Sequence, residues 1–259
     1  MNLENLINYY NKFNEDKRLN TRHGQIEFII TMKYINEYLK KFKNPKILDI
    51  GAGTGKYSIA LANQYDVTAV ELIKHNLRLI EKKSDKVKTI WGNAINLKKI
   101  KDESFDLVLL FGPMYHLCTR KEQTKALLEA KRVVKKSGII MVAYIMSDYA
   151  IISRGFREHE ILNEIKKGRI DSNFIIKPKE TDLYNYVRLE DINELNKITN
   201  LKRIKIFTPD GPANYMRRTL NEMNIEEYKI FMDYVFNISE RMDLIGAAAH
   251  TVDILKKED

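Results

Sequence analysis

The stretch ILDIGAGTGKYS, residues 47–58, decides the fold that we expect for this chain. A short apolar run carries one acid, Asp49, and is followed by three glycines at alternate positions, Gly51, Gly53 and Gly55. A glycine-rich turn between a strand and a helix lets the backbone approach a ligand closely. The spacing of the glycines therefore indicates which class of ligand the turn accepts.

The turn does not have the spacing of a nucleoside triphosphate loop. That loop needs four residues between its glycines, and then Lys followed by Ser or Thr. Here three residues separate Gly51 from Gly55, and Lys56 is followed by Tyr57, which cannot replace the magnesium-binding hydroxyl. The spacing argues against ATP or GTP as the ligand.

A dinucleotide loop is disfavoured by the same kind of count. Its third glycine would fall on Lys56 when counted from Gly51, and on Ser58 when counted from Gly53. A larger side chain there prevents the close helix–strand contact that the third glycine permits. The carboxylate of Asp49 would also repel a pyrophosphate and attract a cation. We therefore expect a ligand that carries a positive charge.

Around this turn, apolar segments of strand character alternate with amphipathic helical segments. Such alternation predicts an α/β fold with a mostly parallel sheet that helices cover on both faces. We expect strands at residues 46–50, 67–72, 87–94, 105–112, 138–146, 201–207 and 249–257. We expect helices at residues 1–42, 56–65, 73–84, 120–138, 151–168, 189–200 and 214–241, with Gly138 closing the one that begins at residue 120.

The length of 259 residues and the hydrophobic content of 44% suit one sizeable core. We therefore predict a single domain over residues 1–259. Its parts are an N-terminal helical lid, a core that binds the ligand of the glycine turn, and two cap insertions, at residues 1–43, 44–147, 148–188 and 212–243, respectively. The insertions fall where α/β sheets carry their ligand-binding loops.

Composition predicts a cytoplasmic protein without a membrane segment. The single cysteine, Cys118, excludes an intramolecular disulfide, no apolar run reaches 18 residues, and the first residues mix acids and amides unlike a secretion signal. The net charge of +9 comes from bases that are interleaved with acids along the chain. This pattern favours a solvated surface over a nucleic-acid interface. The sequence predicts no particular oligomeric state.

The motif LDIGAGTG, with Glu71 closing the second expected strand, resembles the class I S-adenosylmethionine-dependent methyltransferases. The similarity is to the small-molecule type, the methyltransferase domain families 11 and 25, and it covers residues 44–146. It implies a Rossmann-like sheet of seven strands with the last antiparallel, and S-adenosylmethionine as cofactor. The residues that match its cofactor positions are Asp49, Gly51, Ala52, Gly53, Gly55, Glu71, Leu72, Asn93, Ala94, Phe111 and Gly112.

The resemblance also implies roles for these positions. The glycine turn approaches the methionine moiety, Asp49 faces its ammonium group, and Glu71 accepts hydrogen bonds from the ribose hydroxyls. Asn93 departs from the acid that usually lies beside the adenine, but its amide oxygen can accept from the adenine amino group. The cofactor contacts are therefore expected to survive this change.

The segment after the fourth strand, LFGPMYHLCTR, corresponds to the part that lies beside the transferred methyl group in this family. It lacks the Asn-Pro-Pro-Tyr sequence of enzymes that methylate adenine amino groups. Tyr115 and His116 are the candidate catalytic residues, since a histidine takes up a proton near neutral pH. A cap of the turn or a cofactor contact is the alternative role for His116.

The N-terminal helices are expected to close over the acceptor site. The side chains that we expect to bind the acceptor are Tyr9, Tyr10, Arg18, His23 and Tyr215. Glu27 lies in the same N-terminal region, and Arg217 and Arg218 are candidates for an acceptor carboxylate. His250, at the start of the last strand, is expected to be structural. We predict no metal site, because the histidines are scattered.

The predicted function is methyl transfer from S-adenosylmethionine to a small-molecule acceptor, with the acceptor atom undetermined. A general base is needed only if the nucleophile holds a proton of high pKa. One alternative is an RNA acceptor, which would require Lys166, Lys167, Arg169 and the bases at residues 202–205 to converge on the pocket. The other is a module that binds the cofactor without catalysis.

Overall fold

A seven-stranded sheet organises the chain, in the order β3-β2-β1-β4-β5-β7-β6. The structure is a computed structural model that describes residues 3–12 and 20–257. The strands, from β1 to β7, are Lys46–Ile50, Asp66–Glu71, Val87–Trp91, Phe105–Leu110, Val134–Ile145, Leu201–Phe207 and His250–Lys257. Each strand lies at its predicted position or within a few residues of it.

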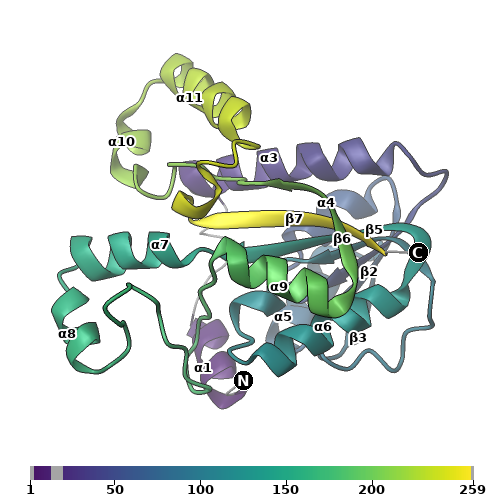
Figure 1. The fold of residues 1–259 in the computed structure, drawn as a ribbon. Helices are drawn as coiled ribbons and strands as arrows, with labels where there is room; N and C mark the ends of the chain where they lie inside the picture. Colours follow the sequence, from purple (N-terminus) through teal and green to yellow (C-terminus); the bar gives the residue numbers. More distant parts are fainter. Residues whose placement is uncertain (1–2, 13–19, 258–259) are drawn as a thin grey trace.

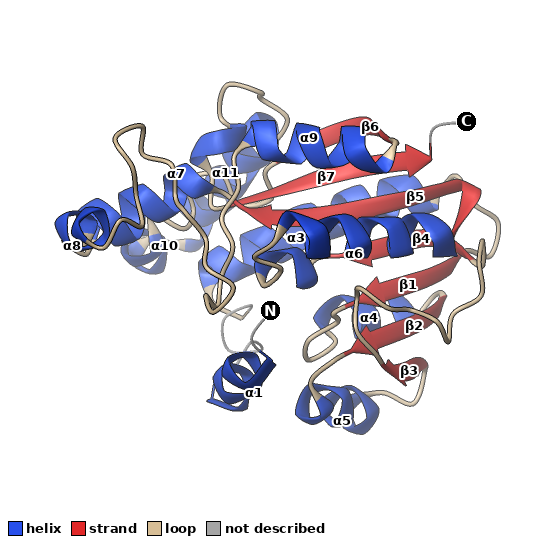
Figure 2. Cartoon of the chain, turned by 60° about the horizontal axis from the view of Figure 1, so that its bottom comes forward, coloured by secondary structure: helices blue, strands red, loops and turns tan. Residues whose placement is uncertain are grey.

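The strands β1 to β5 run parallel to one another, whereas β7 runs antiparallel to both β5 and β6 (Figure 2). The Rossmann-like sheet with an antiparallel last strand is therefore confirmed. The central strand β4 is buried along its whole length, as expected for a parallel strand that is covered on both faces.

Helices pack on both faces of the sheet and bury two hydrophobic clusters. On one face lie α6 and α9, which contribute Leu127 and Leu195 to the core. On the other face lie α3, α4, α5, α10 and α11, which contribute side chains such as Ile30, Leu61 and Ile80. The bounds are Arg22–Leu39 for α3, Lys56–Ala62 for α4, Lys74–Lys83 for α5, Arg120–Val133 for α6, Leu189–Thr199 for α9, Arg217–Glu222 for α10 and Ile225–Ile238 for α11.

The predicted helix at residues 120–138 is too long. The helix α6 ends at Val133, and the chain continues directly into β5, where Val134 pairs with Phe105 of β4. A register shift follows, so that Gly138 lies within the strand instead of capping the helix. A Cβ atom on Gly138 would lie 2.9 Å from the carbonyl oxygen of Asp106, so this glycine permits a close backbone approach.

Several elements lie beyond the end of the sheet at which β5 ends and β7 begins (Figure 1). They are α1 at Leu3–Lys12, α7 at Ser147–Ala150 with the wide π-helical turn Ile151–Arg157, α8 at Ile161–Lys166, and α10. Their division into a lid and caps stays a prediction. Within the part of the chain that the structure describes, the helices fall short of the length and apolar character needed to span a membrane.

Candidate cofactor and acceptor site

The glycine turn joins β1 to α4 in a backbone conformation that favours glycine. Gly51 has a φ of +71°, and its N–H donates to the carbonyl oxygen of Val70 at 2.7 Å. A Cβ atom on Gly51 would lie 2.5 Å from Cδ of Pro113, and one on Gly112 would lie 2.8 Å from the carbonyl oxygen of Gly51. The turn therefore packs directly against residues 112–113, which follow β4, and leaves room for no side chain between them.

The acid in the first strand lies under this turn. Asp49 is buried, and the hydroxyl of Ser58 at the start of α4 donates to its carboxylate at 2.5 Å. Burial raises the pKa of Asp49 to about 6 despite this hydrogen bond. A ligand with a positive charge beside Asp49 would favour the ionised carboxylate, as the sequence predicts for this position.

The acid at the end of the second strand holds the turn in place. The carboxylate of Glu71 accepts hydrogen bonds from the N–H groups of Gly53 at 2.8 Å and Ile73 at 2.7 Å. Burial nevertheless raises the pKa of Glu71 to about 7. The carboxylate is thus fixed in orientation, and its protonation state changes near neutral pH.

Two cavities meet at the glycine turn. The smaller has a volume of about 70 Å³ and is lined by Glu71, Leu72, Asn93 and Ala94. The larger has a volume of about 310 Å³ and is lined by Asp49, Ala52 and Phe111 among others. Both cavities share Tyr10, Gly51, Gly53 and Gly112. The predicted cofactor residues are therefore brought together along one continuous path.

Two predicted cofactor residues have local roles. Gly55 does not line either cavity but lies behind the turn, where a Cβ atom would come within 2.9 Å of Ile80. The amide oxygen of Asn93 accepts from the backbone N–H of Ile95 at 3.2 Å. A second lone pair on that oxygen remains able to accept from a ligand.

The larger cavity is walled mainly by aromatic rings from separate parts of the chain. They are Tyr10, Tyr57, Phe111, Tyr115, Tyr149, Tyr184 and Tyr186. Polar side chains interrupt this wall at Glu27, Thr31, Asn214, Arg217 and His250. An apolar, partly enclosed cavity with a few polar groups is typical of a site for a small organic molecule.

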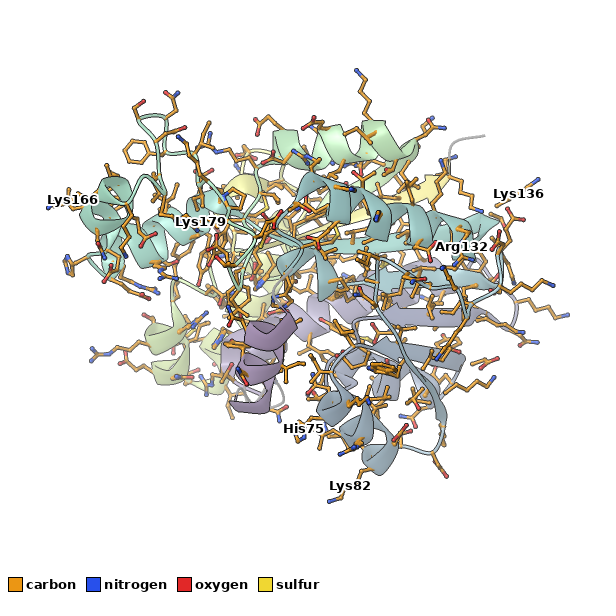
Figure 3. All side chains as sticks on the ribbon, turned by 90° about the horizontal axis from the view of Figure 1, so that it is seen from below. His75, Lys82, Arg132, Lys136, Lys166 and Lys179 are labelled. Carbon is orange, nitrogen blue, oxygen red and sulfur yellow. The ribbon has the colours of Figure 1, made fainter. Side chains whose placement is uncertain are left out.

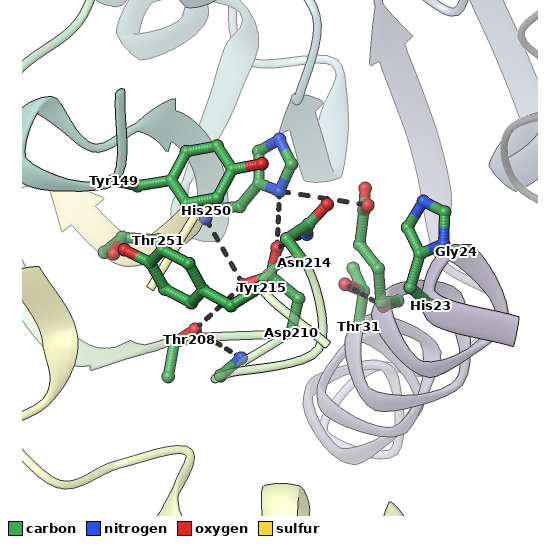
Figure 4. A network of polar contacts seen from close by, with 12 residues as sticks. His23, Gly24, Thr31, Tyr149, Thr208, Asp210, Asn214, Tyr215, His250 and Thr251 are labelled. Atoms are coloured by element: carbon green, nitrogen blue, oxygen red, sulfur yellow. Dashed lines mark hydrogen bonds and ion pairs between the residues drawn. The ribbon is translucent and has the colours of Figure 1, made fainter. Parts of the chain in front are cut away.

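A histidine and a buried aspartate form the main polar pair of this wall. The Nδ1–H of His250, the first residue of β7, donates to Oδ2 of Asp210 at 2.6 Å (Figure 4). The carboxylate of Asp210 is fully buried and also accepts from Thr208 at 3.2 Å and Asn214 at 2.6 Å. These bonds fix the tautomer and the orientation of the imidazole ring. The expected structural role of His250 is therefore incomplete, because its ring also lines the cavity.

Glu27 lies close to this pair. One ligand atom from each of Glu27, Asp210 and His250 falls within 4.8 Å of the others, which is a spacing that a metal ion can bridge. The sequence predicted no such cluster. The 2.6 Å contact between His250 and Asp210 holds a proton on Nδ1, however, and that proton competes with a cation for the same position.

The two predicted catalytic residues face different cavities. Tyr115 lines the larger one, with its ring 5.7 Å from that of His250. His116 lines the smaller one, where its Nδ1–H donates to the carbonyl oxygen of Leu183 at 2.7 Å and its Nε2 accepts from Tyr10 at 2.8 Å. Burial lowers the pKa of His116 to about 4, so its ring is neutral near pH 7.

Of the described side chains that were expected to bind the acceptor, Tyr10 lines both cavities, and Arg217, the candidate for an acceptor carboxylate, lines the larger one. Tyr9 supports the wall from behind, since its hydroxyl accepts from that of Tyr184 at 2.7 Å. His23 is buried beside Thr21, and the hydroxyl of Tyr215 donates to the carbonyl oxygen of Ala247 at 2.8 Å. Arg18 lies outside the described residues.

Comparison with known proteins agrees with this geometry. Residues 48–142, which run from β1 into β5 and include the glycine turn, match the methyltransferase domain family. This part of the chain is therefore similar to the class I S-adenosylmethionine-dependent methyltransferases, and the cofactor of that class is S-adenosylmethionine. The predicted family and cofactor are confirmed at this level.

Three similar proteins illustrate the range of the family. An uncharacterized protein of Methanocaldococcus jannaschii is 30% identical over 148 residues, which cover 55% of this chain and 62% of that protein. An O-methyltransferase of Aspergillus nomiae is 28% identical over 122 residues, which cover 44% of this chain and 52% of the enzyme. The alignments thus span between half and two thirds of these relatives. The crystal structure of a methyltransferase from Methanosarcina mazei has the same fold, with a TM-score of 0.57 at 19% identity, covering 86% of this chain and 96% of that one.

Proposed function

We propose that this protein transfers the methyl group of S-adenosylmethionine to a hydroxyl group of a small organic acceptor. The observation that carries this proposal is the pair of cavities that meet at Gly51 and Gly112. The smaller cavity carries the side chains that would bind an adenosine group, and the larger one can hold the methionine group together with an acceptor. Their junction is the place where a methyl group would pass from one ligand to the other.

The side chains of the smaller cavity fit the proposed cofactor. Glu71 would accept from the ribose hydroxyls, Asn93 from the adenine amino group, and Asp49 would face the ammonium group. Carboxylates beside a cationic ligand gain favourable electrostatic energy in a buried site. When bound, the cofactor supplies an electrophilic methyl group on a sulfonium, so that the protein has mainly to position the nucleophile and exclude water.

We assign the general base to His250 in place of His116. Nδ1 of His250 is held by Asp210, and Nε2 is the ring nitrogen that points away from this carboxylate (Figure 4). Nε2 would take the proton of the acceptor hydroxyl while the oxygen lone pair forms the new bond to carbon and the carbon–sulfur bond breaks. The buried carboxylate of Asp210 would stabilise the positive charge that the ring gains.

Both ring nitrogens of His116 are engaged by Tyr10 and Leu183. We therefore assign His116 a positioning role, in which it holds α1 against the smaller cavity. Tyr115 remains a candidate for contact with the acceptor, because its ring lies in the larger cavity beside His250.

The distribution of basic residues supports a small acceptor over RNA. Four of the six bases that an RNA site would require are paired with acids: Lys167 with Glu164, Arg169 with Asp182, Arg203 with Asp253 and Lys205 with Glu240. Lys166 and Lys136 lie at opposite ends of the molecule (Figure 3). The basic groups are thus distributed around the surface instead of converging at the cavity mouth. The cytoplasmic location expected from the sequence stays a prediction.

Incubation of the purified protein with methyl-labelled cofactor and a cell extract tests the proposal. We expect the label in a small molecule that resists both nuclease and protease, and we expect its formation to be lost in His250→Gln but kept in His75→Gln, a histidine on the exposed face of α5. Label in RNA would support the alternative acceptor. Tight cofactor binding without any transfer would support the non-catalytic module.

A further inference from the structure

Arg217 is an arginine at the cavity that has no carboxylate partner among the described residues. Its side chain lines the larger cavity, and the residue is exposed at the mouth. Its Nη2 donates to Oδ1 of Asn214 at 2.6 Å and to the hydroxyl of Tyr149 at 3.3 Å, and its Nε donates to the same Asn214 oxygen at 3.2 Å. In the described part of the chain, Nη1 has no acceptor.

The guanidinium group is held by neutral groups that are themselves anchored. The amide nitrogen of Asn214 donates to the buried carboxylate of Asp210 at 2.6 Å, and the ring of Tyr149 packs edge-on against Tyr215. Asn214 therefore links Arg217 to the same aspartate that holds His250. A guanidinium that is fixed by neutral acceptors keeps its full positive charge for a further ligand.

Arg218, the next residue in the chain, is an ordinary surface arginine and differs from Arg217 in its surroundings. The side chain of Arg218 is 93% exposed and forms an ion pair with Glu222 at 3.0 Å, one turn along α10. Such exposed pairs contribute little energy. Arg217 and Arg218 thus differ in surroundings although they are adjacent, and they form a matched pair for mutation.

The cavity carries opposite charges at different places. The acids Glu27 and Asp49 line it near the imidazole and the glycine turn, respectively. An anionic group of an acceptor would be repelled there and attracted by Arg217. Lys56 is the other basic side chain of the lining; it lies at the glycine turn and donates to Asn20 at 2.8 Å. The acceptor would therefore bind with its anionic end toward Arg217.

We propose that Arg217, oriented by Asn214, binds the carboxylate of the methyl acceptor, and that the acceptor is a small hydroxy acid. This inference rests on the proposed function. A planar carboxylate matches the two-pronged donor geometry of a guanidinium. With the carboxylate at Arg217, the hydroxyl group at the far end of the molecule is directed toward His250, because both residues line the same cavity.

Equilibrium binding to the protein saturated with S-adenosylhomocysteine tests this inference without requiring turnover. The probes are a panel of small aromatic and aliphatic hydroxy acids, each paired with its neutral primary amide, and binding is measured by calorimetry. We expect at least one acid to bind about 10- to 100-fold more tightly than its amide, as is usual for a charge-assisted hydrogen bond. In Arg217→Gln this preference should disappear, whereas Arg217→Lys should keep part of it and Arg218→Gln all of it.

Three results would overturn the inference. The first is a panel in which no acid binds better than its amide, and the second is a preference that survives in Arg217→Gln. The third is a loss of S-adenosylhomocysteine affinity in Arg217→Gln, which would assign the arginine to the cofactor's own carboxylate. Failure of the proposed function is seen separately, as absence of methyl transfer in the wild type while the acids still bind.

Discussion

Protonation of Glu71 should control the affinity for S-adenosylhomocysteine near neutral pH. The carboxylate is buried, is fixed by the N–H groups of Gly53 and Ile73, and has a pKa raised to about 7. A protonated carboxyl group is a poorer acceptor for the two ribose hydroxyls, so binding requires the ionised form. If that form alone binds, the dissociation constant rises about tenfold between pH 8 and pH 6, or ~1.4 kcal/mol.

Titration calorimetry with the wild type and Glu71→Gln measures this effect. The Gln variant should bind about 10- to 100-fold more weakly at pH 8, and the tenfold change that the Glu71 titration causes between pH 8 and pH 6 should be lost from it. Asp49→Asn is the control, because the pKa of Asp49 is raised only to about 6 and this variant keeps the Glu71 titration. A wild-type affinity that is flat from pH 6 to 8, or an equal slope in Glu71→Gln, would refute the reasoning.

The raised pKa of Glu71 also determines the direction in which the stability of the unliganded protein changes with pH. Because the folded state holds the Glu71 proton more tightly than the unfolded state, the free energy of unfolding falls as the pH rises from about 4.5 through 7. Compared with Glu71→Gln, the free energy of unfolding falls by ~3 kcal/mol in total over this pH range. Denaturant unfolding of both proteins at pH 4.5 and 8 should show this difference, and parallel pH profiles would contradict it.

Three further predictions concern the base, the turn and metal ions. Asp210→Asn should lower kcat by about 100-fold or more, because the neutral amide does not stabilise the positive charge that the His250 ring gains and its NH2 group favours the other tautomer, while S-adenosylhomocysteine affinity stays unchanged; an unchanged kcat would exclude the proposed pair. Gly51→Ala should lower the unfolding free energy and abolish cofactor binding, because its Cβ atom would overlap Pro113, whereas Gly168→Ala, at a similar φ with open space around it, should cost only ~1–3 kcal/mol of backbone strain. EDTA should leave turnover unchanged in a methyl-transfer assay, since the proposed proton transfer to His250 and the displacement at the methyl group require no metal ion; activity that requires added metal would contradict this.

The cofactor half of the site could be predicted because its signals are local. The three glycines, Asp49 and Glu71 all lie near the ends of two consecutive parallel strands, and adjacent parallel strands bring their carboxyl ends together. The spacing in the sequence therefore translates directly into proximity. Gly55 is the exception, since it has the positive φ of the turn but lies behind it.

The acceptor half of the site depends on long-range contacts that no pattern in the sequence predicts. His250 and Asp210 are 40 residues apart and meet only because β7 inserts antiparallel beside β5, which places His250 opposite Ile145. Arg217 lies in the same turn-and-helix segment as Asp210. The sequence indicates it as a candidate for a carboxylate but does not predict its link through Asn214. Long-range pairing of this kind has no periodicity to reveal it.

Two other features of the structure have local physical causes. The 3₁₀ turn Pro113–Tyr115 after β4 directs Tyr115 and His116 into different cavities, although they are neighbours in the sequence. The end of α6 was placed too late because its amphipathic pattern continues into the basic stretch after it. The sheet pairing of Val134 with Phe105 outweighs that pattern.

A crystal structure of the complex with S-adenosylhomocysteine tests the central claim most directly. We predict the adenosine in the smaller cavity between Glu71 and Asn93, and the sulfur at the junction beside Gly51 and Gly112, facing the aromatic cavity in front of His250. An adenosine in the larger cavity, or a sulfur directed away from His250, would contradict it.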